Sequence, residues 1–152
     1  MSLPLEDAIR QCGRHVQRMS NAMERIGFPL TAERLSVDDE SLITLLDQFV
    51  FRYTKLQDTL GEHVLRLFCS QVLLEPVEDA VLADVLALLE RRGYVSESQW
   101  REQRSMRNAL THEYPEQASW QVQTLNNAHF LAQQLVALFE RLHAEFKSSK
   151  LA

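Results

Sequence analysis

Residues 42–67, LITLLDQFVFRYTKLQDTLGEHVLRL, carry the longest apolar pattern of the chain. Its apolar residues recur at steps of three or four: Leu42, Leu46, Phe49, Tyr53, Leu56, Leu60, Val64 and Leu67. This spacing places side chains along one face of an α-helix. It predicts a long central helix that is capped by Asp38 or Asp39 and ends at about Leu74, before Pro76.

The same periodicity extends toward the N-terminus. A first helix is predicted from about Pro4 to Ile26, because apolar residues again recur every three or four positions, and residues 27–29 (Gly-Phe-Pro) end it. Residues 31–37 form a short connection with at most one helical turn. Gly61 lies inside the central helix, where a glycine is destabilising unless it permits a kink or the close approach of another helix.

Three more helices are predicted toward the C-terminus. The third begins within residues 76–79 and ends at Gly93, with an inner face of Val81, Leu82, Val85, Leu86 and Leu89. Ser96, three residues before Gln99, resembles a capping box at the start of the fourth. The fifth begins near Ser119 and carries the stripe Ala128, Ala132, Leu135, Phe139, Leu142 and Phe146.

These patterns predict an all-α fold, an up-and-down bundle of four to five helices. At 152 residues the chain forms one domain, expected over residues 1–147, with residues 148–152 as a frayed tail. A net charge of −5 argues against broad, nonspecific nucleic-acid binding. It leaves room for a local basic groove, since residues 91–107 contain five arginines and two glutamates.

Localisation is expected to be cytoplasmic. Cys12 and Cys69 lie apart at apolar positions, as core thiols do in a reducing compartment. The N-terminus lacks the charged-then-apolar pattern of a signal peptide. No apolar run approaches the roughly 18–20 residues of a membrane span, so no membrane partner is expected.

The fourth helix differs from the others. Its stripe runs Trp100, Gln103, Arg107, Leu110 and Tyr114, and a guanidinium facing a core is costly unless it is paired. This predicts that the helix faces a groove or a partner. Arg107 and His112 suit metal-independent RNA cleavage, because a histidine transfers protons and a guanidinium stabilises charge on phosphate. The alternative from composition is structural: Arg107 pairs with Glu102 or another carboxylate, His112 sits by the helix end and Tyr114 packs.

No cofactor or metal site is predicted. Glu140 and His143 have the spacing of a helical di-metal motif, but a second such pair is missing. Cys12 and His15 likewise lack the two further ligands that a zinc site needs.

The segment Arg107-Asn108-Ala109-Leu110-Thr111-His112-Glu113-Tyr114-Pro115 resembles the motif of HepT-type HEPN proteins. Residues 47–58, DQFVFRYTKLQD, resemble the long second helix of the same family, and the order of helices also agrees over roughly residues 1–147.

This resemblance implies a helical homodimer that brings two motifs together in a cleft and cleaves RNA without metal, as a toxin. Arg107 and His112 would be catalytic and Asn108 would support them. The partner would be an MntA-type nucleotidyltransferase antitoxin that adds AMP to Tyr114; the added negative charge would repel an RNA backbone. Two alternatives stay open: a noncatalytic substrate-binding or partner subunit of a two-chain nucleotidyltransferase, and a helical interaction protein without an active site.

Overall fold

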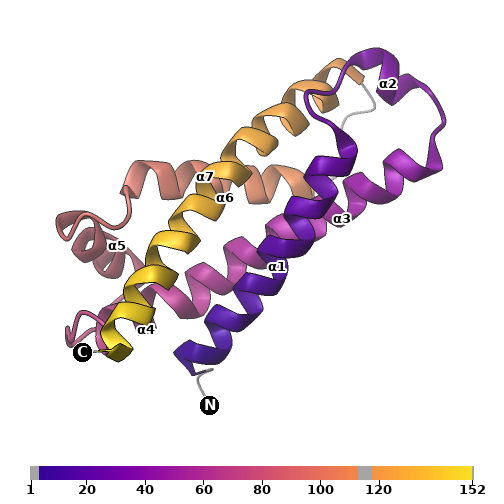
Figure 1. Ribbon diagram of the computed structural model, residues 1–152. Helices are drawn as coiled ribbons and strands as arrows, with labels where there is room; N and C mark the ends of the chain where they lie inside the picture. The colour runs from indigo at the N-terminus through magenta and orange to yellow at the C-terminus, as the bar shows by residue number, and fades with distance from the viewer. Residues whose placement is uncertain (1–3, 113–117, 152) are drawn as a thin grey trace.

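A computed structural model describes residues 4–112 and 118–151 of the chain, and every regular element in these ranges is helical (Figure 1). The elements are α1 (Leu5–Ile26), α2 (Ala32–Ser36), α3 (Glu40–Thr59), the π-helical η1 (Leu60–Val64), α4 (Leu65–Gln71), α5 (Leu82–Arg91), α6 (Glu97–Thr111) and α7 (Ala118–Leu151). The predicted all-α fold is confirmed. None of the described helices is long and apolar enough to cross a membrane.

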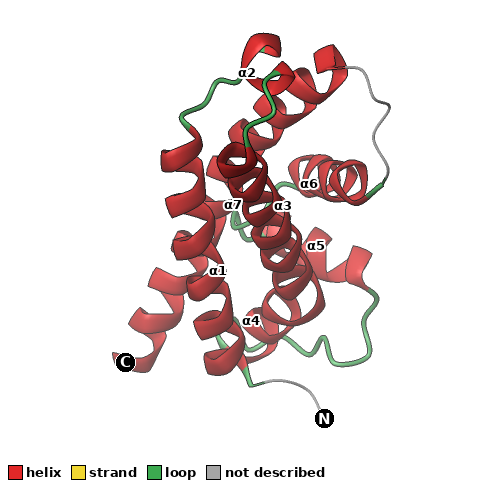
Figure 2. Cartoon of the chain, turned by 90° about the vertical axis from the view of Figure 1, so that its right-hand side faces the viewer, coloured by secondary structure: helices red, strands yellow, loops and turns green. Residues whose placement is uncertain are grey.

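The long helices lie together along the length of the molecule. Figure 1 shows α1, the continuous run of α3, η1 and α4, and α7 extending in this direction, with the two ends of the chain at the same end of the bundle. Seen from the side in Figure 2, α6 points toward the viewer while α1 and α3 run vertically, so α6 lies across the bundle. The crossing helix is the one that carries the predicted site.

The apolar stripes face one core, as the sequence predicts. The most deeply buried large side chains include Tyr53, Phe49, Phe68, Leu5, Met19, Ile26, Leu56, Leu60, Leu65, Leu89, Leu135 and Leu142. They come from α1, α3, η1, α4, α5 and α7, so each long stripe contributes to the same interior. Cys12 and Cys69 are buried free thiols, as expected. Burial raises the pKa of the Cys12 thiol to about 12, which keeps it protonated and unreactive.

Helix ends agree with the capping residues in the sequence. The Asp39 carboxylate accepts hydrogen bonds from the backbone N–H groups of Ser41 and Leu42, at 3.0 and 3.2 Å. The Ser96 hydroxyl accepts one from the N–H of Gln99, at 3.4 Å. These side chains satisfy backbone donors that have no partner within the helix. The start of α6 is therefore encoded locally.

The region between the central helix and α5 differs from the prediction. The central helix ends at Gln71 instead of Leu74, and α5 starts only at Leu82, with Val81 extended before it. Val81 and Leu82 are 62% and 37% exposed, so their assignment to the inner face was wrong. The physical reason lies in Arg66, whose guanidinium donates to the carbonyls of Val77 and Ala80 and holds the connection outside a helix.

The C-terminal tail, predicted to fray, is helical in the structure. Helix α7 continues to Leu151. Lys150 forms an ion pair with Glu6 of α1, with 3.3 Å between Nζ and Oε2. The same ammonium lies 4.8 Å from the centre of the Phe146 ring. These contacts tie the last turn to the bundle.

Candidate functional site

Three buried side chains attach α6 to the bundle and orient Arg107. Trp100, Gln103 and Leu110 are each less than 5% exposed and lie at helical spacing along one face. Arg107 comes four residues after Gln103 and three before Leu110, on that same face. Its side chain therefore points toward α3 and is only 26% exposed.

Gln103 is buried, and both ends of its side-chain amide are hydrogen-bonded within the bundle. Its amide oxygen accepts a short hydrogen bond from the hydroxyl of Tyr53 on α3. Its amide nitrogen donates to the carbonyl of Leu131 on α7, at 2.7 Å. A buried amide with both ends paired is stable in a core. The polar position in the α6 stripe is thus a hydrogen-bonded link among three helices. Gln103 also lines a surface cavity of about 590 Å³, together with Trp100 and Leu135.

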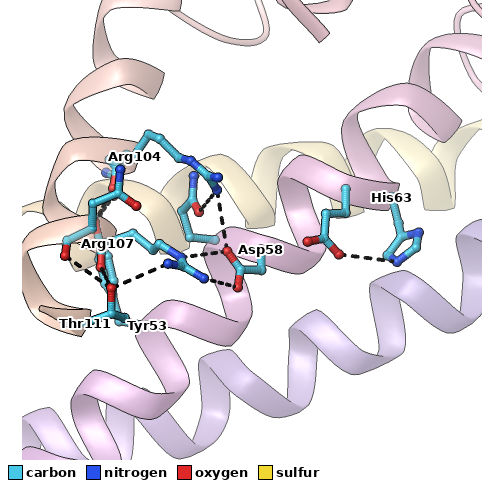
Figure 3. Close-up of polar contacts among 10 residues, drawn as sticks. Tyr53, Asp58, His63, Arg104, Arg107 and Thr111 are labelled. Atoms are coloured by element: carbon cyan, nitrogen blue, oxygen red, sulfur yellow. Dashed lines mark hydrogen bonds and ion pairs between the residues drawn. The ribbon is translucent and has the colours of Figure 1, made fainter. Parts of the chain in front are cut away.

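Arg107 is held by Asp58 of α3 in a two-point ion pair, shown in Figure 3. The guanidinium donates from Nε to Oδ1 and from Nη2 to Oδ2, both at 2.9 Å. Such paired bonds are among the stronger polar contacts in proteins and fix the plane of the guanidinium. The pKa of Arg107 is raised, first by the hydrogen bonds to Asp58. The sequence alternative in which Arg107 pairs with a carboxylate is confirmed, with Asp58 as the partner.

Asp58 also forms an ion pair with a second arginine, Arg104. The Nη1 atom of Arg104 lies 3.6 Å from Asp58 Oδ1 and donates to the Gln57 amide oxygen at 3.3 Å (Figure 3). The third nitrogen of Arg107, Nη1, is 3.5 Å from the Thr111 hydroxyl. Two guanidiniums share one carboxylate, so the cluster keeps one positive charge in excess.

The remaining motif residues lie at the end of α6. His112 is the C-cap residue, with extended backbone, and its side chain is exposed. Asn108 is exposed as well, and its carbonyl accepts from the Thr111 hydroxyl at 3.1 Å. In the described part of the chain, Arg107 and His112 share no hydrogen bond. Tyr114, the predicted AMP acceptor, lies outside the described residues.

A surface cavity of about 410 Å³ adjoins the site between α3 and the end of α6. It is lined by Asp47, Val50, Phe51, Thr54, Leu110 and Thr111. Arg107 and His112 do not line this cavity. Thr111, which does, contacts Arg107 and directly precedes His112 in the sequence. The cavity lies on the side of α6 that faces α3.

Metal ligands are not brought together in residues 4–112 and 118–151, where no group of three or more His, Cys, Asp or Glu side chains is placed to hold an ion. Glu140 is exposed, and the His143 ring packs against Phe139, with 5.4 Å between ring centres. His15 accepts a hydrogen bond at Nδ1 from Arg52, at 3.0 Å. The histidines of both candidate pairs are thus used in packing or hydrogen bonding.

Asp58 is the residue that sequence reasoning missed. A basic residue on the buried face of α6 requires an acidic partner. Arg107 at such a position therefore indicated, from the sequence alone, that a carboxylate lies opposite it. The central helix offers Asp47, Asp58 and Glu62 on its outer side, and only the crossing of α6 over α3 selects among them.

Comparisons of this chain with protein-family models, with curated proteins and with solved structures give no match.

Proposed function

We propose that this protein is a metal-independent endoribonuclease of the HepT-like HEPN type, a toxin whose catalytic residues are Arg107 and His112. The observation that carries the proposal is the two-point pair with Asp58, which fixes the Arg107 guanidinium at the surface of α6 five residues before an exposed histidine. A guanidinium that is already oriented stabilises charge on a phosphate without a cost of reorganisation.

The proposed reaction needs one base and one acid. His112 takes the proton of the ribose 2′-OH, and that oxygen attacks the adjacent phosphorus while the bond to the 5′-oxygen breaks. Arg107 stabilises the negative charge on the phosphate oxygens. In a homodimer, the second His112 protonates the leaving oxygen. A cleft shared by two protomers would also bring Arg107 of one chain near His112 of the other, since the two residues share no hydrogen bond within the described part of one chain.

The proposed regulator is an MntA-type nucleotidyltransferase that transfers AMP to Tyr114, with Asn108 supporting the site in the active form. Tyr114 follows His112 by two residues. An added phosphate so close to the Arg–His pair would neutralise its attraction for RNA and obstruct the site. Co-expression with such an enzyme and ATP is expected to add the mass of one AMP, mapped to Tyr114 and lost in Tyr114→Phe.

The catalytic proposal is tested with Arg107→Ala and His112→Ala in the full-length protein. Each change is expected to lower the rate of cleavage of a labelled RNA in EDTA by about 100-fold or more, because a general acid–base group and a group that stabilises developing charge each contribute about that much. Arg101→Ala is the matched control, since Arg101 is on the same helix, exposed, and paired with Glu97. Circular dichroism checks folding, and sedimentation tests for the dimer. Folded variants that cleave as fast as the parent would show that the assignment is wrong.

A second candidate function is a noncatalytic partner subunit of a nucleotidyltransferase. The same ion pair favours this candidate. Asp58 occupies two of the three nitrogens of Arg107, so these two are not available to bind a phosphate. In that case the purified chain binds the enzyme tightly but leaves RNA intact, and Arg107→Ala changes only stability. Cleavage by the free parent protein in EDTA would exclude it.

A further inference from the structure

One face of the bundle carries a group of basic side chains that the candidate site does not use. Helices α1 and α3 pack side by side (Figure 1), and along their contact lie Arg14 and Arg18 from α1 and Arg52 and Lys55 from α3. We call these four residues the cationic face. Arg14, Arg18 and Lys55 are exposed, and Arg52 is partly buried against His15.

The cationic face lacks the acidic partners that five arginines elsewhere in the described residues have. Ion pairs join Arg10 to Glu6 and Asp7, Arg92 to Glu75, Arg101 to Glu97, and Arg104 and Arg107 to Asp58. Within residues 4–112 and 118–151, none of the four residues of the cationic face has a carboxylate within ion-pair distance. On a chain of net charge −5, this is a local concentration of unbalanced positive charge.

Folding alone does not account for this arrangement. Arg14 and Arg18 are four residues apart on one helix, and like charges at this spacing destabilise it. Burial lowers the pKa of His15, and Arg52, Arg14, Lys55 and Arg18 lower it further. The pKa of Arg52 is lowered by burial and then by Arg18 and Arg14. Only positive side chains act on these two groups, so the face has a surplus of positive charge.

An exposed aromatic ring lies among these cations. Phe51 is 50% exposed. The Arg52 guanidinium carbon is 5.1 Å and the Lys55 ammonium 5.6 Å from the centre of its ring. Both cations lie over the ring in cation–π contact. Exposed aromatic rings combined with such cations form the surfaces that hold single strands, where bases stack and phosphates meet positive charges.

Phe51 also connects the cationic face with α6. It lines the cavity of about 410 Å³ that reaches Leu110 and Thr111, the residue before His112. A strand stacked on Phe51 would therefore continue along this cavity toward the end of α6.

We infer that the cationic face and Phe51 bind single-stranded RNA and lead it toward the end of α6. The identity of the strand as RNA rests on the proposed function, whereas the attraction for a single-stranded polyanion rests on the face itself. An acidic peptide would satisfy the positive charges but would leave the ring of Phe51 without a stacking partner, so the observations favour a nucleic acid.

Binding is measured with a fluorescent, 20-nucleotide oligouridine that is methylated at every 2′-oxygen, so that cleavage cannot occur. In about 100 mM salt, Arg14→Gln combined with Arg18→Gln is expected to weaken binding by about tenfold or more. Because each lost phosphate contact lowers the salt dependence for a single strand by about 0.7, the slope of log K against log salt should decrease by about 1.4. Phe51→Ala is expected to weaken binding by at least about fivefold through lost stacking, with the slope unchanged.

The matched control is Arg91→Gln combined with Lys147→Gln, which changes the net charge equally at exposed sites on α5 and α7. The inference is overturned if this control weakens binding as much as the α1 variant, Arg14→Gln combined with Arg18→Gln. It is overturned as well if polyglutamate of equal length displaces the oligonucleotide when both are added at equal total charge. It is also overturned if the parent does not bind. Loss of cleavage in His112→Ala with binding retained supports it, and binding by the parent without any cleavage refutes only the ribonuclease proposal.

The α1 variant also separates a binding role from a structural role. Relief of repulsion between like charges is expected to leave its melting temperature in low salt unchanged or higher. A fall of several degrees would assign these arginines to the fold and overturn the inference.

Discussion

At the scale of single residues, a carboxylate, and not the proposed catalytic pair of Arg107 and His112, lies at the centre of the candidate site. Asp58 accepts two hydrogen bonds from Arg107 and lies within ion-pair distance of Arg104. Its side chain is 20% exposed, that of Arg107 26% and that of Arg104 56%. Because surrounding water weakens ion pairs, the two arginines should differ strongly in how much they depend on Asp58.

Double-mutant cycles test this difference. We expect a coupling energy of about 1–3 kcal/mol between Asp58→Asn and Arg107→Gln, between the values typical of exposed and buried pairs. For Asp58→Asn and Arg104→Gln we expect less than about 1 kcal/mol. Urea unfolding at pH 7 supplies the free energies. Equal couplings for the two arginines would show that Asp58 does not select Arg107.

At the scale of helices, the position of α6 depends on contact between one glycine and one tryptophan. Gly61 lies in η1, and a Cβ atom added there would be 3.0 Å from Cζ2 of the buried Trp100. The predicted role of Gly61 in a close helix approach is confirmed. The contact sets how near α6 lies to the central helix, and hence whether Arg107 reaches Asp58.

Gly61→Ala is therefore expected to destabilise the protein by about 1–3 kcal/mol, although alanine favours helices over glycine, because the buried ring of Trp100 would have to shift. Chemical denaturation measures the change. Gly13→Ala is the control in α1, where the nearest atom to a new Cβ, on Phe139, is 3.9 Å away. A Gly61 variant that is as stable as the parent would indicate that the helices adjust freely.

At the scale of the whole molecule, three histidines link stability to pH. Burial is the main cause that lowers the pKa values of His15, His129 and His143 below the ordinary value of 6.5. Each binds a proton more weakly in the folded than in the unfolded chain. Their contribution to stability is thus complete above pH 6.5 and is lost as the pH falls toward the folded pKa values.

We expect the free energy of unfolding to decrease between pH 7.5 and 5.5, as measured by urea titrations at several pH values. His15→Gln should make this decrease smaller, whatever its effect on stability at pH 7.5, because one of the three linked protons is removed. A decrease that is unchanged or larger in the variant would contradict the role of His15.

The sequence by itself determined the helices, their buried faces and most of their ends, because periodicity of 3.6 residues and capping side chains act over a few neighbouring positions. It also indicated that Arg107 requires a partner. Only the tertiary structure decided that the partner is Asp58, that Gln103 is paired internally with Tyr53 and Leu131, and that α6 lies across the bundle. Likewise, Arg14 and Arg18 became part of a cationic face only when α1 packed against α3. The physical reason is that pairing between side chains far apart in the sequence depends on how helices cross, and the crossing is set by the shapes of whole packed surfaces.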